Sequence, residues 1–139
     1  MKGVCLCGGI QFEILGTTPN LYQCHCSVCR KSTGSSSNTA TIVKSEQFRW
    51  SHTNSDIQTF TLQSGYRIDF CKRCGSPVPN QLRDKELVWI PAGLLENTEL
   101  KVTQHIFVSS KAHWDMIGGQ ATEHEEMPNL EEFVSLLKC

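Results

Sequence analysis

The sequence predicts a mainly β fold of antiparallel sheets with one or two short helices. Short runs of β-branched and aromatic residues, separated by polar turns, fill much of the first two-thirds of the chain, and helical patterns are sparse. In addition, seven of the eight cysteines gather in three tight clusters. This clustering indicates that bound metal organises the sheets and supplies much of their stability.

The predicted strands are short segments with alternating or β-branched apolar residues. In the first, Ile10, Phe12 and Ile14 alternate with polar residues, and glycines lie on either side. This pattern is typical of a half-buried strand. The other predicted strands are 39–43, 48–50, 57–62, 66–70, 87–90 and 105–108.

Two helices are predicted. Residues 27–33 directly follow part of the second cysteine cluster, and Gly34 is a typical residue for the end of a helix. Near the C-terminus, Asn129 can cap a helix, with Glu132 three residues further on. The apolar residues after this cap share one helical face, as in an amphipathic helix.

Length and composition predict one globular domain over residues 1–139. The chain has no internal repeat or linker-like break, and 139 residues is close to the commonest domain size. The net charge is −1 with no basic stripe, so a nucleic-acid partner is not expected. No segment is apolar enough to span a membrane, so no membrane association is expected. The first cysteine pair follows the N-terminus directly and leaves no room for a secretion signal, so we expect a cytoplasmic protein.

The spacing of the cysteines is that of metal ligands. Two thiols one or two residues apart form a disulfide with each other only with difficulty, but they can bind one metal ion together. Clustered cysteines without a secretion signal therefore favour metal binding over a disulfide scaffold. The three clusters are Cys5-x-Cys7, Cys24-x-Cys26-x-x-Cys29 and Cys71-x-x-Cys74. The isolated, terminal Cys139 is assigned no role.

Two of the clusters resemble halves of a structural zinc site. The segment Cys71–Gly75 looks like a zinc knuckle, in which the final glycine tolerates the left-handed backbone of the turn. The pair Cys5 and Cys7 is likewise followed by glycine. Together the two pairs predict a closed site of four thiolates. The alternative, buried cysteines that bind nothing, does not explain the spacing.

The remaining cysteines, Cys24, Cys26 and Cys29, provide three thiolates and leave one coordination position open. Such a site can hold an exogenous thiol or water. Three alternatives stay open: a histidine or carboxylate closes the site, the site is weak, or the thiols bind an iron–sulfur cluster. His25 is expected to face away from its two cysteine neighbours on an extended segment, outside the ligand set.

These motifs resemble the glutathione-dependent formaldehyde-activating enzymes and the related centromere protein V group. The resemblance rests on the stretches Cys5–Cys7, Cys24–Gly34, Phe70–Pro77 and His105–Trp114. It implies a tent-like arrangement of antiparallel β-sheets organised around two Zn²⁺ ions per chain. By position, the structural zinc would be held by Cys5, Cys7, Cys71 and Cys74. The catalytic zinc would be held by Cys24, Cys26 and Cys29.

The activity that the resemblance implies is that of a carbon–sulfur lyase, which joins glutathione and formaldehyde as S-(hydroxymethyl)glutathione. The expected partner is therefore a small-molecule thiol, most simply glutathione, whose two carboxylates call for cations. Arg30, Lys31 and Lys111 lie in the matching segments. Two alternatives stay open: a non-catalytic zinc β-domain that binds a protein, and a related enzyme that uses another thiol or electrophile. The sequence makes no prediction of the oligomeric state.

Overall fold

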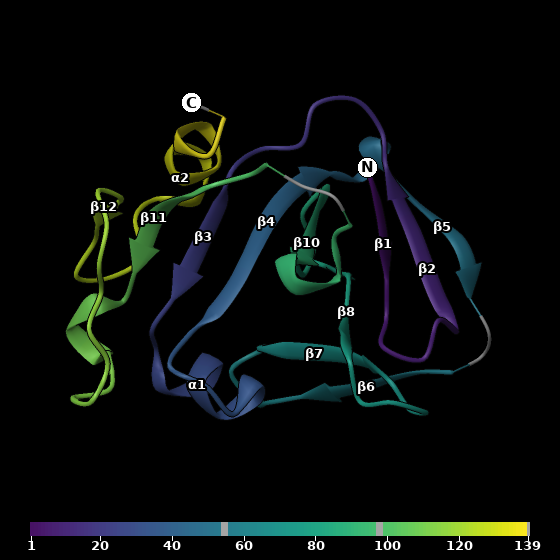
Figure 1. Ribbon diagram of the computed structural model, residues 1–139, viewed down its shortest axis with the longest axis horizontal. Helices are drawn as coiled ribbons and strands as arrows, with labels where there is room; N and C mark the ends of the chain where they lie inside the picture. The colour runs from purple at the N-terminus through teal and green to yellow at the C-terminus, as the bar shows by residue number, and fades with distance from the viewer. Residues whose placement is uncertain (54–55, 97–98, 139) are drawn as a thin grey trace. The chain divides into compact units, whose positions relative to one another are not determined.

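The computed structural model describes residues 1–53, 56–96 and 99–138 (Figure 1). In this part of the chain the protein is mainly β, with three sheets and two α-helices, as predicted. The chain divides into two compact units. Unit 1 is Met1–Thr18 with Ile42–Thr98, and unit 2 is Pro19–Thr41 with Glu99–Cys139. A single domain over 1–139 stays a prediction, and Cys139 lies outside the described residues.

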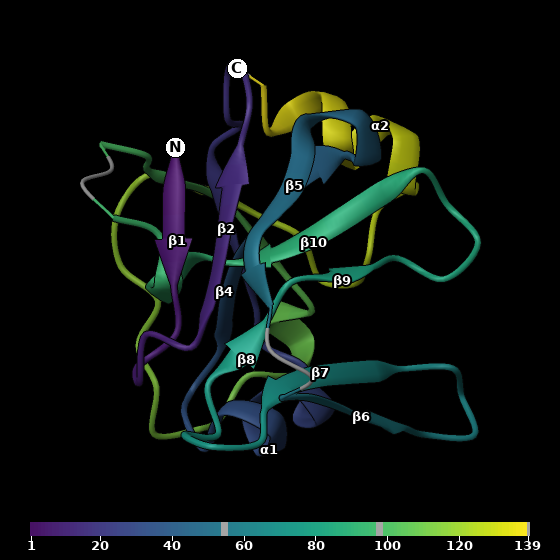
Figure 2. The same cartoon turned by 90° about the vertical axis from the view of Figure 1, so that its right-hand side faces the viewer.

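Unit 1 begins with an antiparallel sheet in the order β1-β2-β5 (Figure 2). Its strands are β1 (Lys2–Val4), β2 (Ile10–Ile14) and β5 (Phe48–Thr53), and a 3₁₀ helix, η1 (Ser45–Gln47), precedes β5. The predicted alternation in β2 is confirmed, because its three isoleucine and phenylalanine side chains are at most 1% exposed. They divide between two apolar clusters, one around Phe12 and one around Ile10.

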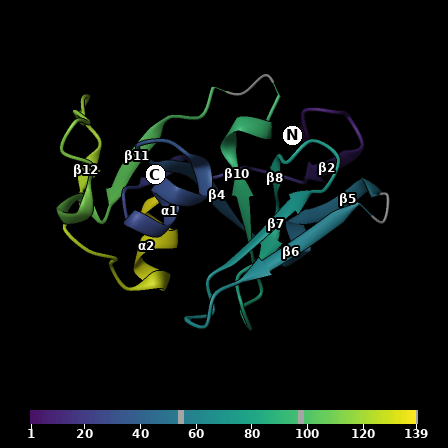
Figure 3. The same cartoon turned by 90° about the horizontal axis from the view of Figure 1, so that it is seen from below.

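A second antiparallel sheet in unit 1 has the order β6-β7-β8 (Figure 3). Its strands are β6 (Ile57–Thr61), β7 (Arg67–Cys71) and β8 (Pro77–Val78). In addition, β9 (Asn80–Gln81) pairs with β10 (Leu87–Pro91), and the 3₁₀ helix η2 (Ala92–Leu94) follows β10. The Ile10 cluster includes Cys5, Cys71 and Val78, so two cysteines belong to the apolar interior of this unit.

Unit 2 places β3 (Leu21–Cys24) between β4 (Asn38–Lys44) and β11 (Val102–Ile106), with β12 (Thr122–Glu123) beyond β11 (Figure 1). Only the part of β4 up to Thr41 belongs to this unit. The β3–β4 pair is antiparallel, whereas β11 runs parallel to both β3 and β12. Among the described strands most pairs are thus antiparallel, and the parallel pairs β3–β11 and β11–β12 lie in unit 2.

Both predicted helices are confirmed and lie in unit 2. Helix α1 (Ser27–Thr33) ends at Gly34, whose φ of 63° is left-handed. Helix α2 (Leu130–Leu136) begins after Asn129, whose side chain accepts hydrogen bonds from two backbone N–H groups. Its Phe133 packs edge-on against Tyr22 of β3, with ring centroids 5.0 Å apart. No helix in the described residues is long and apolar enough to cross a membrane.

One strand prediction was wrong at its end. The predicted strand 105–108 is observed as β11, which stops at Ile106. Phe107 has a left-handed backbone with a φ of 55°, and Val108–Ser110 form a 3₁₀ helix, η3. The change in backbone conformation at Phe107 ends the strand pairing, although the apolar side chains continue to Val108.

Candidate metal centres

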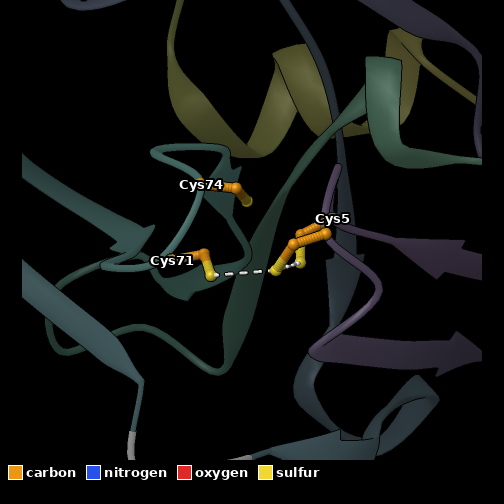
Figure 4. A group of neighbouring side chains, drawn as sticks. Cys5, Cys71 and Cys74 are labelled. Atoms are coloured by element: carbon orange, nitrogen blue, oxygen red, sulfur yellow. Dashed lines mark hydrogen bonds between the residues drawn. The ribbon is translucent and has the colours of Figure 1, made fainter.

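The first candidate centre lies in unit 1, where four cysteines from the two chain segments of the unit meet. The sulfurs of Cys5, Cys7, Cys71 and Cys74 all lie within 4.8 Å of one another. Cys5 Sγ is 3.6 Å from Cys7 Sγ, which in turn is 3.8 Å from Cys71 Sγ. Figure 4 shows the side chains of Cys5, Cys71 and Cys74 turned toward a common space. Sulfurs this close can bind one metal ion together.

Each cysteine pair sits on a tight turn that ends in a glycine. Gly8 and Gly75 have φ values of 78° and 77°, a conformation that a side chain would strain. The turns are closed by backbone hydrogen bonds, from Gly8 N to Cys5 O at 2.9 Å and from Gly75 N to Cys71 O at 2.7 Å. The predicted left-handed glycine of each knuckle is therefore confirmed.

Polar groups around this centre set the charge on its sulfurs. Ser76 lies beside Cys74, and its hydrogen bond holds the pKa of that thiol at about 6. At Cys7, the Gly9 backbone N–H lowers the pKa, but the hydrogen bond with Cys5 and burial outweigh it and raise the pKa to about 11. One thiol thus ionises readily while a neighbour resists, as expected when anions share a small space. A bound cation would remove that resistance.

The second candidate centre lies in unit 2, at the junction of β3 and α1. The sulfurs of Cys24, Cys26 and Cys29 also lie within 4.8 Å of one another. Cys24 is the last residue of β3, Cys26 is the N-cap of α1, and Cys29 is in the first turn. Cys24 and Cys29 are buried, and Cys26 is half-buried. We call these three residues the triad.

Within the triad, Cys26 carries the negative charge most easily. Hydrogen bonds from the thiols of Cys24 and Cys29 hold the pKa of Cys26 near 2. The backbone N–H of Cys29 also donates to Cys26 Sγ at 3.4 Å. The same thiol contacts, together with burial, raise the pKa of Cys24 far above its usual range. The triad therefore holds one thiolate readily, and ionisation of the others needs a cation.

In the part of the chain that the structure describes, the triad gains no further histidine, cysteine or carboxylate ligand. Among residues 1–53, 56–96 and 99–138, no other cysteine, histidine, aspartate or glutamate places a ligand atom within the same 4.8 Å group. His25, although it lies between two triad residues, points elsewhere: its Nε2 is 2.9 Å from Nδ1 of His105. Within the described chain, the triad therefore offers three sulfurs and no fourth ligand of these types.

Comparison with known proteins agrees with the motifs. The model of the family described as glutathione-dependent formaldehyde-activating enzyme matches residues 1–110. The chain belongs to this family. This result confirms the resemblance inferred from the cysteine motifs. A comparison with curated proteins found no match.

A solved structure is also similar to this family member. It is the crystal structure of a Rhodobacter sphaeroides protein, with a TM-score of 0.58 and 24% sequence identity. The match covers 70% of this chain and 90% of that chain. At this level of identity the likeness shows a shared fold and nothing further.

The three cations considered for a thiol ligand differ in their surroundings. Arg30 is half-buried, and its Nη2 donates to the backbone oxygen of Ser110 at 3.4 Å. Lys111 is exposed and donates to the backbone oxygen of Asp115 at 3.0 Å. Lys31 is exposed in the last turn of α1. Arg30, which directly follows Cys29, is thus less exposed than the two lysines.

Sequence reasoning missed three polar residues that contact the candidate centres or their neighbours. Ser76 is beside Cys74, His105 is hydrogen-bonded to His25, and Asp115 Oδ2 lies 3.7 Å from His25 Nδ1. Ser76 and His105 lie in segments that resemble the family. Their contacts with residues distant in sequence depend on how the strands pair, which the sequence does not show. The sequence signal available for Ser76 was its position two residues after Cys74.

Proposed function

We propose that the chain is a zinc-dependent carbon–sulfur lyase that acts on glutathione adducts. In the simplest case it joins glutathione and formaldehyde as S-(hydroxymethyl)glutathione. One observation carries the proposal: three converging cysteine sulfurs that no other described histidine, cysteine or carboxylate joins, in a member of this family. A purely structural site would be expected to have four protein ligands.

The donor sets fit zinc. Both groups consist of sulfur alone, and thiolates at short sequence spacing are typical zinc ligands. We assign Cys5, Cys7, Cys71 and Cys74 to a structural zinc. We assign the triad to a catalytic zinc, which gives two Zn²⁺ per chain. When bound by the triad, zinc would supply a coordination position for an exogenous thiol and lower the pKa of that thiol.

The reaction itself balances without an oxidant or reductant. The glutathione sulfur attacks the formaldehyde carbon, a C–S bond forms, and the C=O π bond breaks. The oxygen then takes up the proton that the thiol has lost. The contribution of the protein is to hold the thiol ionised and close to the aldehyde, because proximity converts a bimolecular step into an effectively unimolecular one.

Binding of the tripeptide would use cations near the triad. Arg30 is the best candidate for a carboxylate contact, because it follows Cys29 directly and its Nε is buried without a hydrogen-bond partner in the described chain. Lys31 and Lys111 are more exposed alternatives. Cysteines clustered at metal-ligand spacing are typical of a reducing compartment, so we propose a cytoplasmic location for this activity.

Cobalt substitution tests the open position. After both sites are loaded with Co²⁺, glutathione is titrated and the sulfur-to-metal charge-transfer band is followed. We expect the band to change and to saturate at one thiol per chain. Simple thiols without carboxylates should bind more weakly, and Arg30→Gln should remove most of that difference while Lys85→Gln, distant in sequence and exposed, should not.

A band that no thiol changes, with two metals bound, would mean that a protein ligand closes the site. The lyase assignment would then be abandoned in favour of a zinc β-domain that binds a protein partner. A response to other thiols but not to glutathione would support the open coordination position and would mean that the substrate is a different thiol.

A further inference from the structure

We propose that His105 is a positioning residue for the triad. Through His25, its side chain fixes the segment that carries Cys24 and Cys26. This inference rests on the proposed role of the triad as a metal site, and it assigns a task to two histidines that are not in either ligand set.

The two imidazoles form a buried pair in unit 2. His25 is 1% exposed and His105 is 4% exposed. His25 Nε2 lies 2.9 Å from His105 Nδ1, and the ring centroids are 5.1 Å apart. The two nitrogens are at hydrogen-bonding distance and are shielded from water, so one nitrogen of the pair must donate to the other. A buried polar group that loses its hydrogen-bond partner destabilises the folded state, so an apolar side chain cannot replace either imidazole without cost.

The pair acts on the triad because of where His25 sits. Side chains alternate on an extended segment, so the ring of His25 points away from the sulfurs on either side of it. Its backbone is already tied to β11, since His25 N donates to Ile106 O at 3.0 Å. One step earlier, Cys24 is in parallel register with Ile106. The hydrogen bond between the His25 and His105 side chains adds a second attachment to β11, at the residue between Cys24 and Cys26.

Asp115 orients the pair from its other end. Asp115 Oδ2 lies 3.7 Å from His25 Nδ1, a nitrogen with no hydrogen-bond partner in the described chain. The nearby carboxylate favours a proton on Nδ1. Nε2 of His25 then accepts, and the Nδ1–H of His105 donates. The arrangement therefore requires a donor at the δ position of residue 105.

This requirement supplies a matched set of variants. Asparagine places an amide N–H close to the position of Nδ1, so His105→Asn keeps the donor. His105→Leu introduces an apolar side chain of similar bulk and removes the donor. Both are studied in the full chain, loaded with Co²⁺, and the spectrum of Cys26→Ser is subtracted to isolate the signal of the triad.

We expect His105→Leu to weaken cobalt binding at the triad by about ten-fold, as chelator competition would show. It should also shift the d–d bands of the triad, while the four-cysteine site keeps its wild-type spectrum. His105→Asn should restore both affinity and spectrum. A merely structural role would lower the unfolding midpoint of His105→Leu without moving the spectrum of the triad.

A folded His105→Leu protein with wild-type affinity and bands at the triad would overturn the proposal. If this variant does not fold, His105→Gln replaces it, because glutamine carries its amide one bond too far from the backbone; wild-type behaviour of that variant would equally overturn it. Cobalt binding by the wild-type triad distinguishes failure of the proposed function from failure of the inference about His105. If its triad binds no cobalt, the proposed function fails and this inference fails with it. If it binds cobalt and responds to glutathione while every His105 variant is unchanged, only the inference fails.

Discussion

The hydroxyl oxygen of Ser76 lies 3.3 Å from the sulfur of Cys74 and accepts a hydrogen bond from the backbone N–H of Leu6 at 3.0 Å. Leu6 is the residue between Cys5 and Cys7. The same oxygen accepts from the Cys74 thiol, and when Cys74 is ionised the Ser76 hydroxyl can instead donate its hydrogen to the thiolate. One side chain thus links the two cysteine pairs of the first candidate centre.

Ser76→Ala should weaken metal binding at this centre. Loss of the hydroxyl removes the largest contribution to the lowered pKa of Cys74 and leaves Leu6 N–H without its acceptor. We expect about a ten-fold loss of zinc affinity, measured by competition with a chromophoric chelator. Ser76→Thr, which retains the hydroxyl, should bind nearly as the wild type does. Equal affinities for the alanine variant and the wild type would show that the contact has no effect.

Cys74→Ser should prevent stable folding. Binding energy at a structural zinc site is largely folding energy, on the order of 10 kcal/mol or more, and Cys5 and Cys71 also belong to the apolar interior of unit 1. Expression yield, circular dichroism and zinc content would test this expectation. A soluble variant that unfolds cooperatively with unchanged zinc content would remove these four cysteines from the ligand assignment.

Cys26→Ser should have a different outcome. The triad lies at one strand end and the first turn of a short helix, so its loss should lower bound zinc from about two per chain to about one and leave the chain folded. Elemental analysis and a thermal unfolding curve measure both quantities. Unfolding as complete as that of Cys74→Ser would make the triad structural and favour the interaction-module alternative.

Local patterns predicted the elements that depend on neighbours in sequence. The alternation of Ile10, Phe12 and Ile14 fixed β2, and the glycine at 34 fixed the end of α1. The cysteine spacings were also local signals, and both sulfur groups assemble from the predicted residues. What these signals could not supply was pairing between distant segments.

Strand β3 illustrates the limit. Its four residues are too few for a periodic pattern, and its partner β11 lies about eighty residues later in the chain. The contact between His25 and His105 depends on that parallel register, so spacing alone could not reveal it. Two-residue strands such as β8 and β12 likewise carry no periodicity.

Gly3→Ala should destabilise unit 1. Gly3 pairs with Phe12 across β1 and β2, and a Cβ there would lie within 2.6 Å of Phe12 Cε1 and closer still to Cζ. Because Phe12 is 1% exposed and packed against Phe48 and Trp50, its ring has little room to move. We expect a loss of about 1–3 kcal/mol in urea unfolding. Lys2→Ala, at an exposed position of the same strand, should cost much less; equal losses would contradict the steric explanation.

His105 should make stability depend on pH below neutrality. Burial lowers its pKa in the folded chain, although Glu123 and Asp115 oppose the shift, and His25 shares its hydrogen bond. The unfolded chain, with a histidine pKa of about 6.5, therefore takes up this proton first as the pH falls. The contribution of the neutral ring is fully present above pH 6.5 and is lost as the pH drops toward the folded-state pKa. Urea midpoints at pH 7.5 and pH 5.5 should differ less in His105→Asn than in the wild type at equal zinc loading. His52→Asn, at an exposed position of β5, should retain the full difference. If His105→Asn keeps the pH dependence of the wild type, this imidazole takes up its proton equally in the folded and unfolded chains. The argument from burial would then fail.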